Sequence, residues 1–141
     1  MKIITKNIEF STKGKSDIID ITYQVKERLR ETKLEDGIVT IFVPGSTAGI
    51  TTMEFEPGQI DDLREVIDKL IPKNKSYAHN HSMSGSDGNA HSHLRASLFQ
   101  ADITVPFKDS ELLLGTWQQI VFIDFDIYPR QRDVVLQFIG E

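Results

Sequence analysis

The sequence predicts a single α+β domain spanning residues 1–141, with largely antiparallel sheets and two main helices. Three observations support this fold class. The length of 141 residues fits one domain, because single domains usually hold roughly 100–150 residues. Strand-like segments outnumber helix-like segments. The last strand-like segments follow one another without helices between them, an order that favours antiparallel sheets over a doubly wound parallel sheet.

The first third of the chain is predicted to form a strand, a helix and a second strand. Residues 2–10 alternate between apolar and polar side chains, which is typical of a strand. Apolar residues then recur at three- and four-residue spacing, which predicts an amphipathic helix that Ser16 caps and that ends near Lys33. Residues 38–43 are a continuous β-branched and aromatic run. Such a run predicts a strand covered on both faces.

The rest of the chain is predicted to hold a second main helix, a short third helix and several strands. The second main helix spans about 59–70 and ends before Pro72. Asn89 is predicted to cap a short helix that continues to Phe99. The predicted strands of this part are 50–53, 103–106, 111–114, 117–125 and 133–139.

Composition narrows the classes of function. The chain has no cysteine, which excludes disulfides, thiolate metal sites and cysteine nucleophiles. Its net charge of −5 argues against a nucleic-acid partner, because phosphate backbones are bound by basic surfaces. The longest apolar runs fall far short of the ~20 residues of a membrane span, and no secretory-signal pattern opens the sequence. We therefore expect a cytoplasmic protein that binds neither nucleic acid nor membrane.

All 4 histidines lie in one polar, glycine-bearing segment, His79 to His93. Imidazole is a common metal ligand and proton shuttle near neutral pH, so a metal or acid–base site is expected here. Residues i and i+2 of a helix lie about 200° apart. If His91 and His93 begin a helix, only one of them is expected to join His79. The alternative is a polar surface loop that happens to contain histidines.

Two further segments are candidates for binding phosphate. The turn before the short helix offers the backbone amides of Asn89 and Ala90, and Arg95 lies one turn after His91. Ser46 and Thr47 follow a predicted strand, where hydroxyls and amides often hold ligand oxygens. The alternatives are an ordinary turn with an asparagine cap and a bend between two strands.

Two other features have simpler structural interpretations. A glycine precedes the only tryptophan, Trp117, by two positions, which indicates a bulge or a close approach. We expect Trp117 in the core or at a subunit interface. Arg130 and Arg132 are interpreted as a solvated turn, balanced by Asp124 and Asp126.

Several of these motifs, taken together, resemble the YjbQ-like family, whose members are often labelled secondary thiamine-phosphate synthases. The resemblance covers nearly the whole chain and includes an arginine-bearing final turn. It rests on Val43-Pro44-Gly45-Ser46-Thr47-Ala48, His79-Asn80, Gly88-Asn89-Ala90-His91-Ser92-His93-Leu94-Arg95-Ala96-Ser97-Leu98 and Gly115-Thr116-Trp117-Gln118-Gln119-Ile120. It implies a compact α+β fold and a homotrimer, with the histidine segment and the Pro44 loop near a subunit boundary.

The resemblance also implies an activity: joining a hydroxymethylpyrimidine diphosphate to a thiazole phosphate, with release of pyrophosphate. The expected partner is thus a phosphorylated small molecule, and the expected cofactor is a divalent metal, zinc or magnesium. Many relatives carry histidine where this chain has Gly45, and His91 is a candidate to replace it in space. The expected residues are His79, His93 and Asp87 for catalysis, His79, His91 and His93 for metal, and Ser46, Thr47, Asn89 and Arg95 for substrate.

A non-enzymatic homotrimer that binds a metal or an anion is the competing interpretation. A metal closed by four protein ligands would favour it, because catalysis requires an open coordination position. A phosphate group bound beside His93 would favour the enzyme.

Overall fold

The structure, a computed structural model, describes residues 1–82 and 88–141, which form two antiparallel sheets and their covering helices. The larger sheet has the order β1-β8-β3-β5-β6 and the smaller one β2-β7-β4. The strands are β1 (Lys2–Thr12), β2 (Asp17–Asp20), β3 (Gly37–Phe42), β4 (Ala48–Met53), β5 (Asp102–Lys108), β6 (Glu111–Leu112), β7 (Gln119–Asp124) and β8 (Arg130–Gly140). The helices are α1 (Thr22–Thr32), α2 (Pro57–Leu70), the 3₁₀ turn η1 (Ala78–His81) and α3 (Ala90–Phe99).

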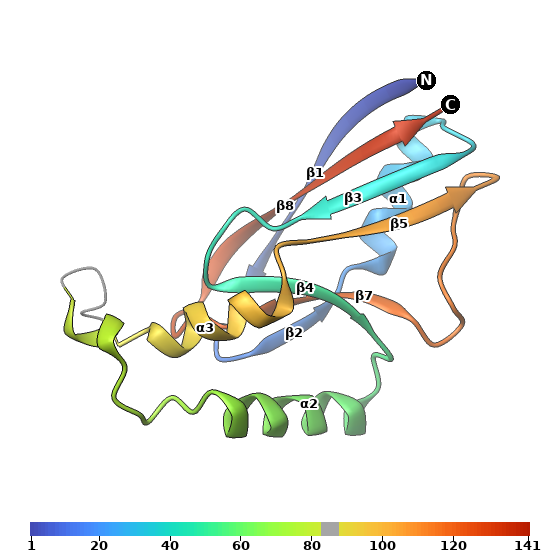
Figure 1. The fold of residues 1–141 in the computed structure, drawn as a ribbon. Helices are drawn as coiled ribbons and strands as arrows, with labels where there is room; N and C mark the ends of the chain where they lie inside the picture. The colour runs from blue at the N-terminus through green and yellow to red at the C-terminus, as the bar shows by residue number, and fades with distance from the viewer. Residues whose placement is uncertain (83–87) are drawn as a thin grey trace.

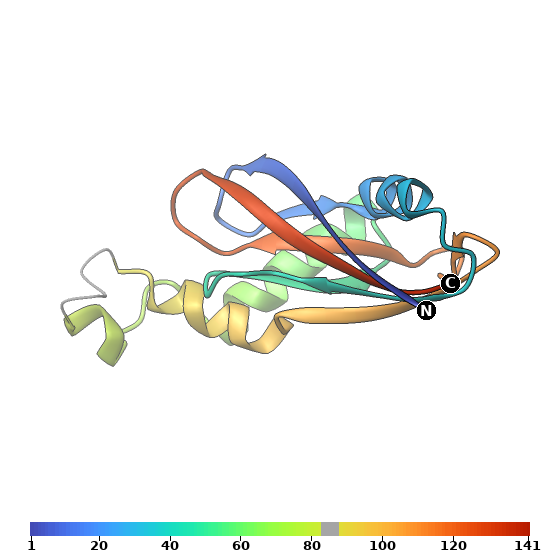
Figure 2. The ribbon, with the colours of Figure 1, turned by 90° about the horizontal axis from the view of Figure 1, so that it is seen from above.

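The smaller sheet lies between the larger sheet and the helices α2 and α3 (Figure 1). Its central strand, β7, is buried on both faces. Ile120 and Phe122 point into the core between the sheets, whereas Val121 and Ile123 pack in the core that α2 and α3 cover. Seen from above, the two termini lie at one end of the molecule, and η1 with the start of α3 lies at the other (Figure 2). The predicted α+β class with antiparallel sheets is confirmed.

The first predicted helix begins later than its apolar spacing suggests. Residues 17–20 form β2, in which Ile18 pairs with Ile123 of β7, so Ser16 is not a helix cap. The helix starts at Thr22, whose backbone N–H and hydroxyl both donate to Asp20 Oδ1. The apolar residues of the buried strand and of the amphipathic helix that follows it are spaced as in one continuous helix. The spacing alone therefore does not show where the strand ends and the helix begins.

The prediction that residues 38–43 are covered on both faces is wrong. Val39 and Ile41 are buried, but Ile38 is 40% exposed and Phe42 is 43% exposed. β3 belongs to the larger sheet, whose outer face no other element of the described chain covers. The doubly buried strand is instead β7.

Two smaller expectations also need correction. Trp117 is 73% exposed, so it is not a core residue of this chain. Asn89 lies at the N-cap position of α3, but its side chain makes no capping hydrogen bond. Among the described residues, no helix combines the length and the apolar character that crossing a membrane requires.

Candidate functional site

The structure brings His79 and His93 together, and we call them the histidine pair. Their ring centroids lie 4.9 Å apart, and the rings meet edge to face at 72°. His79 lies on η1 and His93 on the first turn of α3. The Nε2 atom of His79 is buried and has no hydrogen-bond partner among the described residues. Since buried polar atoms are nearly always satisfied, this nitrogen is suited to bind something from outside the chain.

His91 does not join this pair, because residues two apart on a helix point in different directions. Its side chain is 4% exposed and lines a different cavity from His93. Burial lowers the pKa of His91, and the charges of Arg95 and Lys73 lower it further, so the imidazole is neutral near pH 7. The expectation that His91 replaces a histidine missing at position 45 is therefore wrong.

The expected three-histidine metal site is not assembled. Within residues 1–82 and 88–141, no group of three or more histidine, aspartate or glutamate side chains is arranged to hold a metal ion. His81 is exposed and contacts Ser76 Oγ at 3.3 Å, away from the pair. Asp87, the expected catalytic carboxylate, lies outside the described residues. The histidine pair thus supplies two imidazoles and no third ligand from the described chain.

His93 borders two cavities. One lies toward the loop after β3 and the other toward the η1 turn. One cavity measures about 340 Å³ and the other about 450 Å³. Gly49 allows this arrangement, because a Cβ atom there would lie 2.8 Å from Phe99 Cβ, and α3 packs directly on β4. The first cavity is lined by Gly45, Ser46, Ala48, His93, Ala96, Ser97, Gln100 and Ala101, and the second by Tyr77, Ala78, His79, Ala90, His93 and Leu94.

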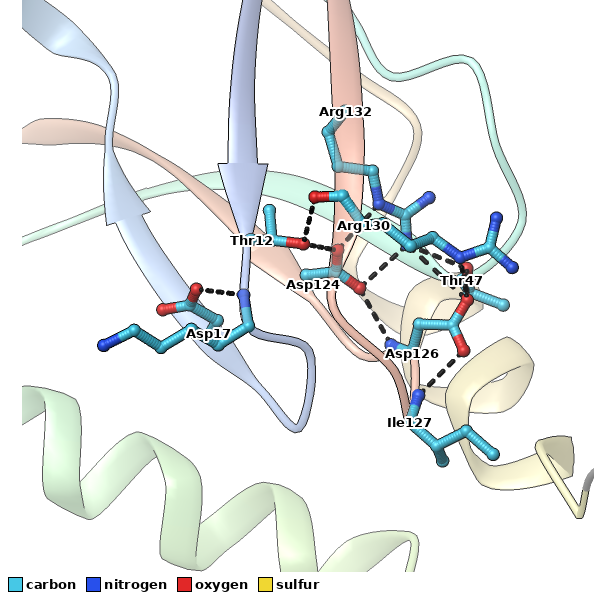
Figure 3. Close-up of polar contacts among 9 residues, drawn as sticks. Thr12, Asp17, Thr47, Asp124, Asp126, Ile127, Arg130 and Arg132 are labelled. Atoms are coloured by element: carbon cyan, nitrogen blue, oxygen red, sulfur yellow. Dashed lines mark hydrogen bonds and ion pairs between the residues drawn. The ribbon is translucent and has the colours of Figure 1, made fainter.

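Thr47 does not face these cavities but belongs to a buried ion network (Figure 3). Arg132 donates to both carboxylate oxygens of Asp124, at 2.7 and 2.8 Å, and to Thr47 Oγ1 at 2.9 Å. The Thr47 hydroxyl donates in turn to Asp126 Oδ2 at 3.2 Å, and Arg130 pairs with the same carboxylate. The hydroxyl of Thr47 is therefore already engaged within the protein, whereas Ser46 borders the cavity beside His93.

The network holds Asp124 ionised and fixes the orientation of Arg132. Burial raises the pKa of Asp124, but hydrogen bonds from Arg132, Thr12 and the Asp126 backbone, with the charge of Arg132, outweigh burial and lower it. The remaining guanidinium nitrogen, Nη1, lies 3.5 Å from the point where a Cβ of Gly45 would stand. Arg132 therefore places a fixed positive charge behind the Gly45–Ser46 loop.

Sequence reasoning interprets Arg132 as part of a solvated turn and misses that its side chain is buried. Its side chain is only 9% exposed. The signal was present in the alternation of β8, because Arg132 shares an inward face with Val134 and Leu136. A charge in register with core residues indicates a buried partner, which here is Asp124.

Arg95 is buried and ties three segments together. Its Nε and Nη2 atoms donate to the carbonyl of Ile71 at 3.0 and 2.7 Å, and Nη1 donates to Ser16 Oγ at 3.4 Å. Asp68 pairs with it at 3.1 Å. Arg95 lines the same cavity as His91, not the cavity of Ser46. Of the expected phosphate-binding residues, Ser46 and Arg95 therefore line different cavities and Asn89 lines neither, while the backbone N–H of Ala90 already donates to Asn80 Oδ1 at 3.0 Å.

Unsatisfied polar atoms gather around the start of α3. Besides His79 Nε2, they are Asn89 Oδ1, His91 Nδ1 and Ser92 Oγ, all buried without a hydrogen-bond partner in the described chain. Only one further buried side-chain atom of the described residues, Asp133 Oδ1, shares this state. Each such atom costs free energy on folding unless a partner is bound, so this end of the molecule is suited to a ligand.

Comparisons with known proteins agree with the fold and with the family that the sequence resembles. A family model described as "UPF0047 protein YjbQ-like" matches residues 6–141. A UPF0047 protein of Methanocaldococcus jannaschii is 37% identical over 134 residues, which is 94% of this chain and 92% of the relative. One from Archaeoglobus fulgidus is 38% identical over 130 residues, covering 92% and 97%.

Solved structures extend the likeness to the whole fold. A crystal structure of a YbjQ-like protein of unknown function from Sulfolobus solfataricus matches with a TM-score of 0.92 at 32% identity and covers 99% of both chains. A hypothetical protein from Aeropyrum pernix matches with a TM-score of 0.90 at 32% identity, covering 98% of this chain and 99% of the other.

Proposed function

The chain belongs to the YjbQ-like UPF0047 family, and from that premise we propose that it is a transferase acting on phosphorylated small molecules at the histidine pair. The observation that carries the proposal is the buried, unpartnered Nε2 of His79 beside His93, which itself borders two open cavities. Perturbed or unsatisfied groups that line a cavity are candidates for an active site.

The proposed reaction joins a pyrimidine diphosphate to a thiazole phosphate. The thiazole nitrogen attacks the methylene carbon of the pyrimidine, a C–N bond forms, and the C–O bond to the diphosphate breaks. The leaving diphosphate keeps the electron pair, and no proton needs to move. The protein's task is then to stabilise the charge that develops on the leaving group.

We assign this task to two side chains that line the cavity beside the Gly45–Ser46 loop and to a third that lies behind the loop. The Ser46 hydroxyl and the His93 imidazole line the cavity and can donate to diphosphate oxygens. Arg132 Nη1 lies behind the loop, and its two hydrogen bonds to Asp124 hold it in place. A donor that is fixed before the substrate binds does not have to reorganise during the reaction.

We propose that a divalent metal binds at the histidine pair. The histidine pair fits a metal that takes two imidazoles from the protein, because His79 Nε2 has no partner in the described part of the chain and the rings are adjacent. A bound metal would supply Lewis-acid stabilisation of the diphosphate. With two ligands from the described residues, its other positions would be open to phosphate oxygens, as catalysis requires.

We further propose that the chain works as a homotrimer. Trp117 and Leu113 are 73% and 56% exposed in one loop of the single chain, and large apolar side chains of this kind are typical of subunit contacts. Sedimentation of the purified protein should give three times the monomer mass. A monomer at micromolar concentration would contradict this part of the proposal.

The transferase is tested by supplying the pyrimidine diphosphate and the thiazole phosphate and measuring thiamine phosphate by chromatography. Activity should be lost in His93→Ala and strongly reduced in His79→Ala. His81→Ala is the matched control, because His81 lies on the same 3₁₀ turn but outside the pair. Product formation that is unaffected by His93→Ala would refute the assignment of the site.

A homotrimer that only binds a metal or an anion is the second candidate. The unsatisfied atoms at the start of α3 favour it as much as the enzyme, since they call for a ligand and not for a reaction. Pyrophosphate binding that depends on His93 without any turnover of the two substrates would select this candidate.

A further inference from the structure

We propose that the cavity between α2, α3 and the β1–β2 turn is a second anion site, which takes a phosphate or diphosphate group of a small molecule. The cavity measures about 500 Å³, within the range of small-molecule sites. It is lined by His91, whereas His93 lines the cavities of the histidine pair. The proposal does not depend on the transferase reaction. The polar and charged residues of this cationic cavity are Lys15, Asp68, Lys73, Asn74, His91 and Arg95.

The charge of this cavity is opposite to that of the chain. Lys15, Lys73 and Arg95 contribute three positive charges and Asp68 one negative charge, which leaves a formal charge of +2 on the lining. The whole chain carries −5. Positive charge gathered in a concave site raises the local concentration of anions and strengthens their binding. A net-acidic protein with such a cavity is suited to select small anions while repelling polyanions.

The two lysines are available to a ligand. Within residues 1–82 and 88–141, neither ammonium group makes a hydrogen bond or an ion pair. By contrast, Lys6 and Lys69 are engaged by Glu31 and Glu65. Lys15 comes from the β1–β2 turn and Lys73 from the segment after α2, so they reach the cavity from different segments of the chain.

An unsatisfied buried atom lies at the same cavity. His91 is 4% exposed, lines the cavity, and has a buried Nδ1 without a partner in the described chain. The neutral imidazole has a single N–H, and with that proton on Nδ1 it can donate to a phosphate oxygen. This is a second observation that points to a ligand, and it is independent of the charges.

The walls of the cavity are fixed by hydrogen bonds. Arg95 binds the carbonyl of Ile71 at the end of α2 and the hydroxyl of Ser16 in the β1–β2 turn. The backbone N–H of Lys15 donates to the carbonyl of Asp126 at 2.6 Å. Arg95 thus contributes its charge and positions the walls, while the lysines and His91 supply the free donors. A site that is built before the ligand arrives loses less entropy on binding.

The test is calorimetric titration of the intact protein with inorganic phosphate and with pyrophosphate, so that the two arms separate a single phosphate from a diphosphate site. In Lys15→Gln/Lys73→Gln, affinity for the preferred anion should fall at least about tenfold, because two charge-assisted hydrogen bonds are lost. The matched control is Lys33→Gln/Lys108→Gln, which removes the same charge from exposed positions outside the cavity.

A third variant, His79→Ala/His93→Ala, separates this site from the proposed active site. It should keep the lysine-dependent binding, and its retention would support two independent sites even if no transferase activity exists. The proposal is overturned if neither anion binds, if the two lysine double variants lose affinity equally, or if the binding disappears with the histidine pair. Amide chemical-shift changes at Lys15 and Asn74 on adding the anion would support the location, and their absence at saturation would contradict it.

Discussion

Replacing Arg132 by methionine should destabilise the fold by about 3–5 kcal/mol, the cost of leaving one member of a buried ion pair without the other. The Asp124 side chain is fully buried, and Arg132 donates to both of its carboxylate oxygens. After the replacement, only the Thr12 hydroxyl and the Asp126 backbone N–H would remain as donors to Asp124. Since small domains are stable by only about 5–15 kcal/mol, this loss would be a large fraction of the total.

The assay is equilibrium unfolding in urea, followed by circular dichroism at one fixed protein concentration. Arg130→Met is the matched control, because that arginine is 53% exposed and pairs with the neighbouring Asp126. It should cost clearly less than Arg132→Met, because the buried Asp126 would keep the Thr47 hydroxyl, the Ile127 backbone N–H and Arg132, 4.0 Å away, as partners. The double variant Arg132→Met/Asp124→Asn should lose less unfolding free energy than the two single variants lose together, because it removes the unpaired charge. A loss in Arg132→Met no greater than in Arg130→Met would refute the reasoning.

Three further predictions follow from the same structure. The pKa of Asp124 is lower in the folded than in the unfolded chain, so its stabilising contribution is present above about pH 4 and is lost as pH falls through the folded pKa. The difference in unfolding free energy between the parent and Asp124→Asn should therefore shrink in acid. A difference that stays constant with pH would contradict this. Gly49→Ala should lower the unfolding free energy by about 1–3 kcal/mol, since the added Cβ would lie 2.8 Å from Phe99 Cβ; an unchanged melting temperature would show that α3 can move away freely. Zinc binding measured by calorimetry should weaken in acid, because protons compete for the ligand nitrogens, and should disappear in His79→Ala/His93→Ala. Full stoichiometry in that variant would place the metal elsewhere.

The sequence predicts those features of the fold that depend on residues close together along the chain. Helical periodicity predicts the short helix that ends at Phe99, and it predicts that only one of His91 and His93 meets His79. Both predictions are confirmed. The burial of a strand depends on the layers that cover it, and these come from distant parts of the sequence. The sequence therefore predicts double coverage for residues 38–43, whereas the structure shows it for β7.

The same distinction applies to the site. Ser46 and Arg95 were both singled out for phosphate, but the path of the chain around α3 leads them to different cavities. Arg132 and Asp124 are eight residues apart in sequence and meet because consecutive strands belong to different sheets. No spacing rule relates such residues. The expectation that Asp124 and Asp126 balance the two arginines agrees with the ion pairs, but only the alternation of β8 indicates that Arg132 is buried.

The pairing of β1 with β8 joins opposite ends of the sequence, from Lys2 opposite Gly140 to Thr12 opposite Arg130. Such pairing raises the contact order of the fold, because nearly the whole chain must close as a loop before these strands gain their hydrogen bonds. We therefore expect slow folding for a domain of this size. A circular permutant that links residue 141 to residue 1 and opens in the loop between β6 and β7 would turn β8 and β1 into a local hairpin. It should fold faster than the parent while reaching the same sheet.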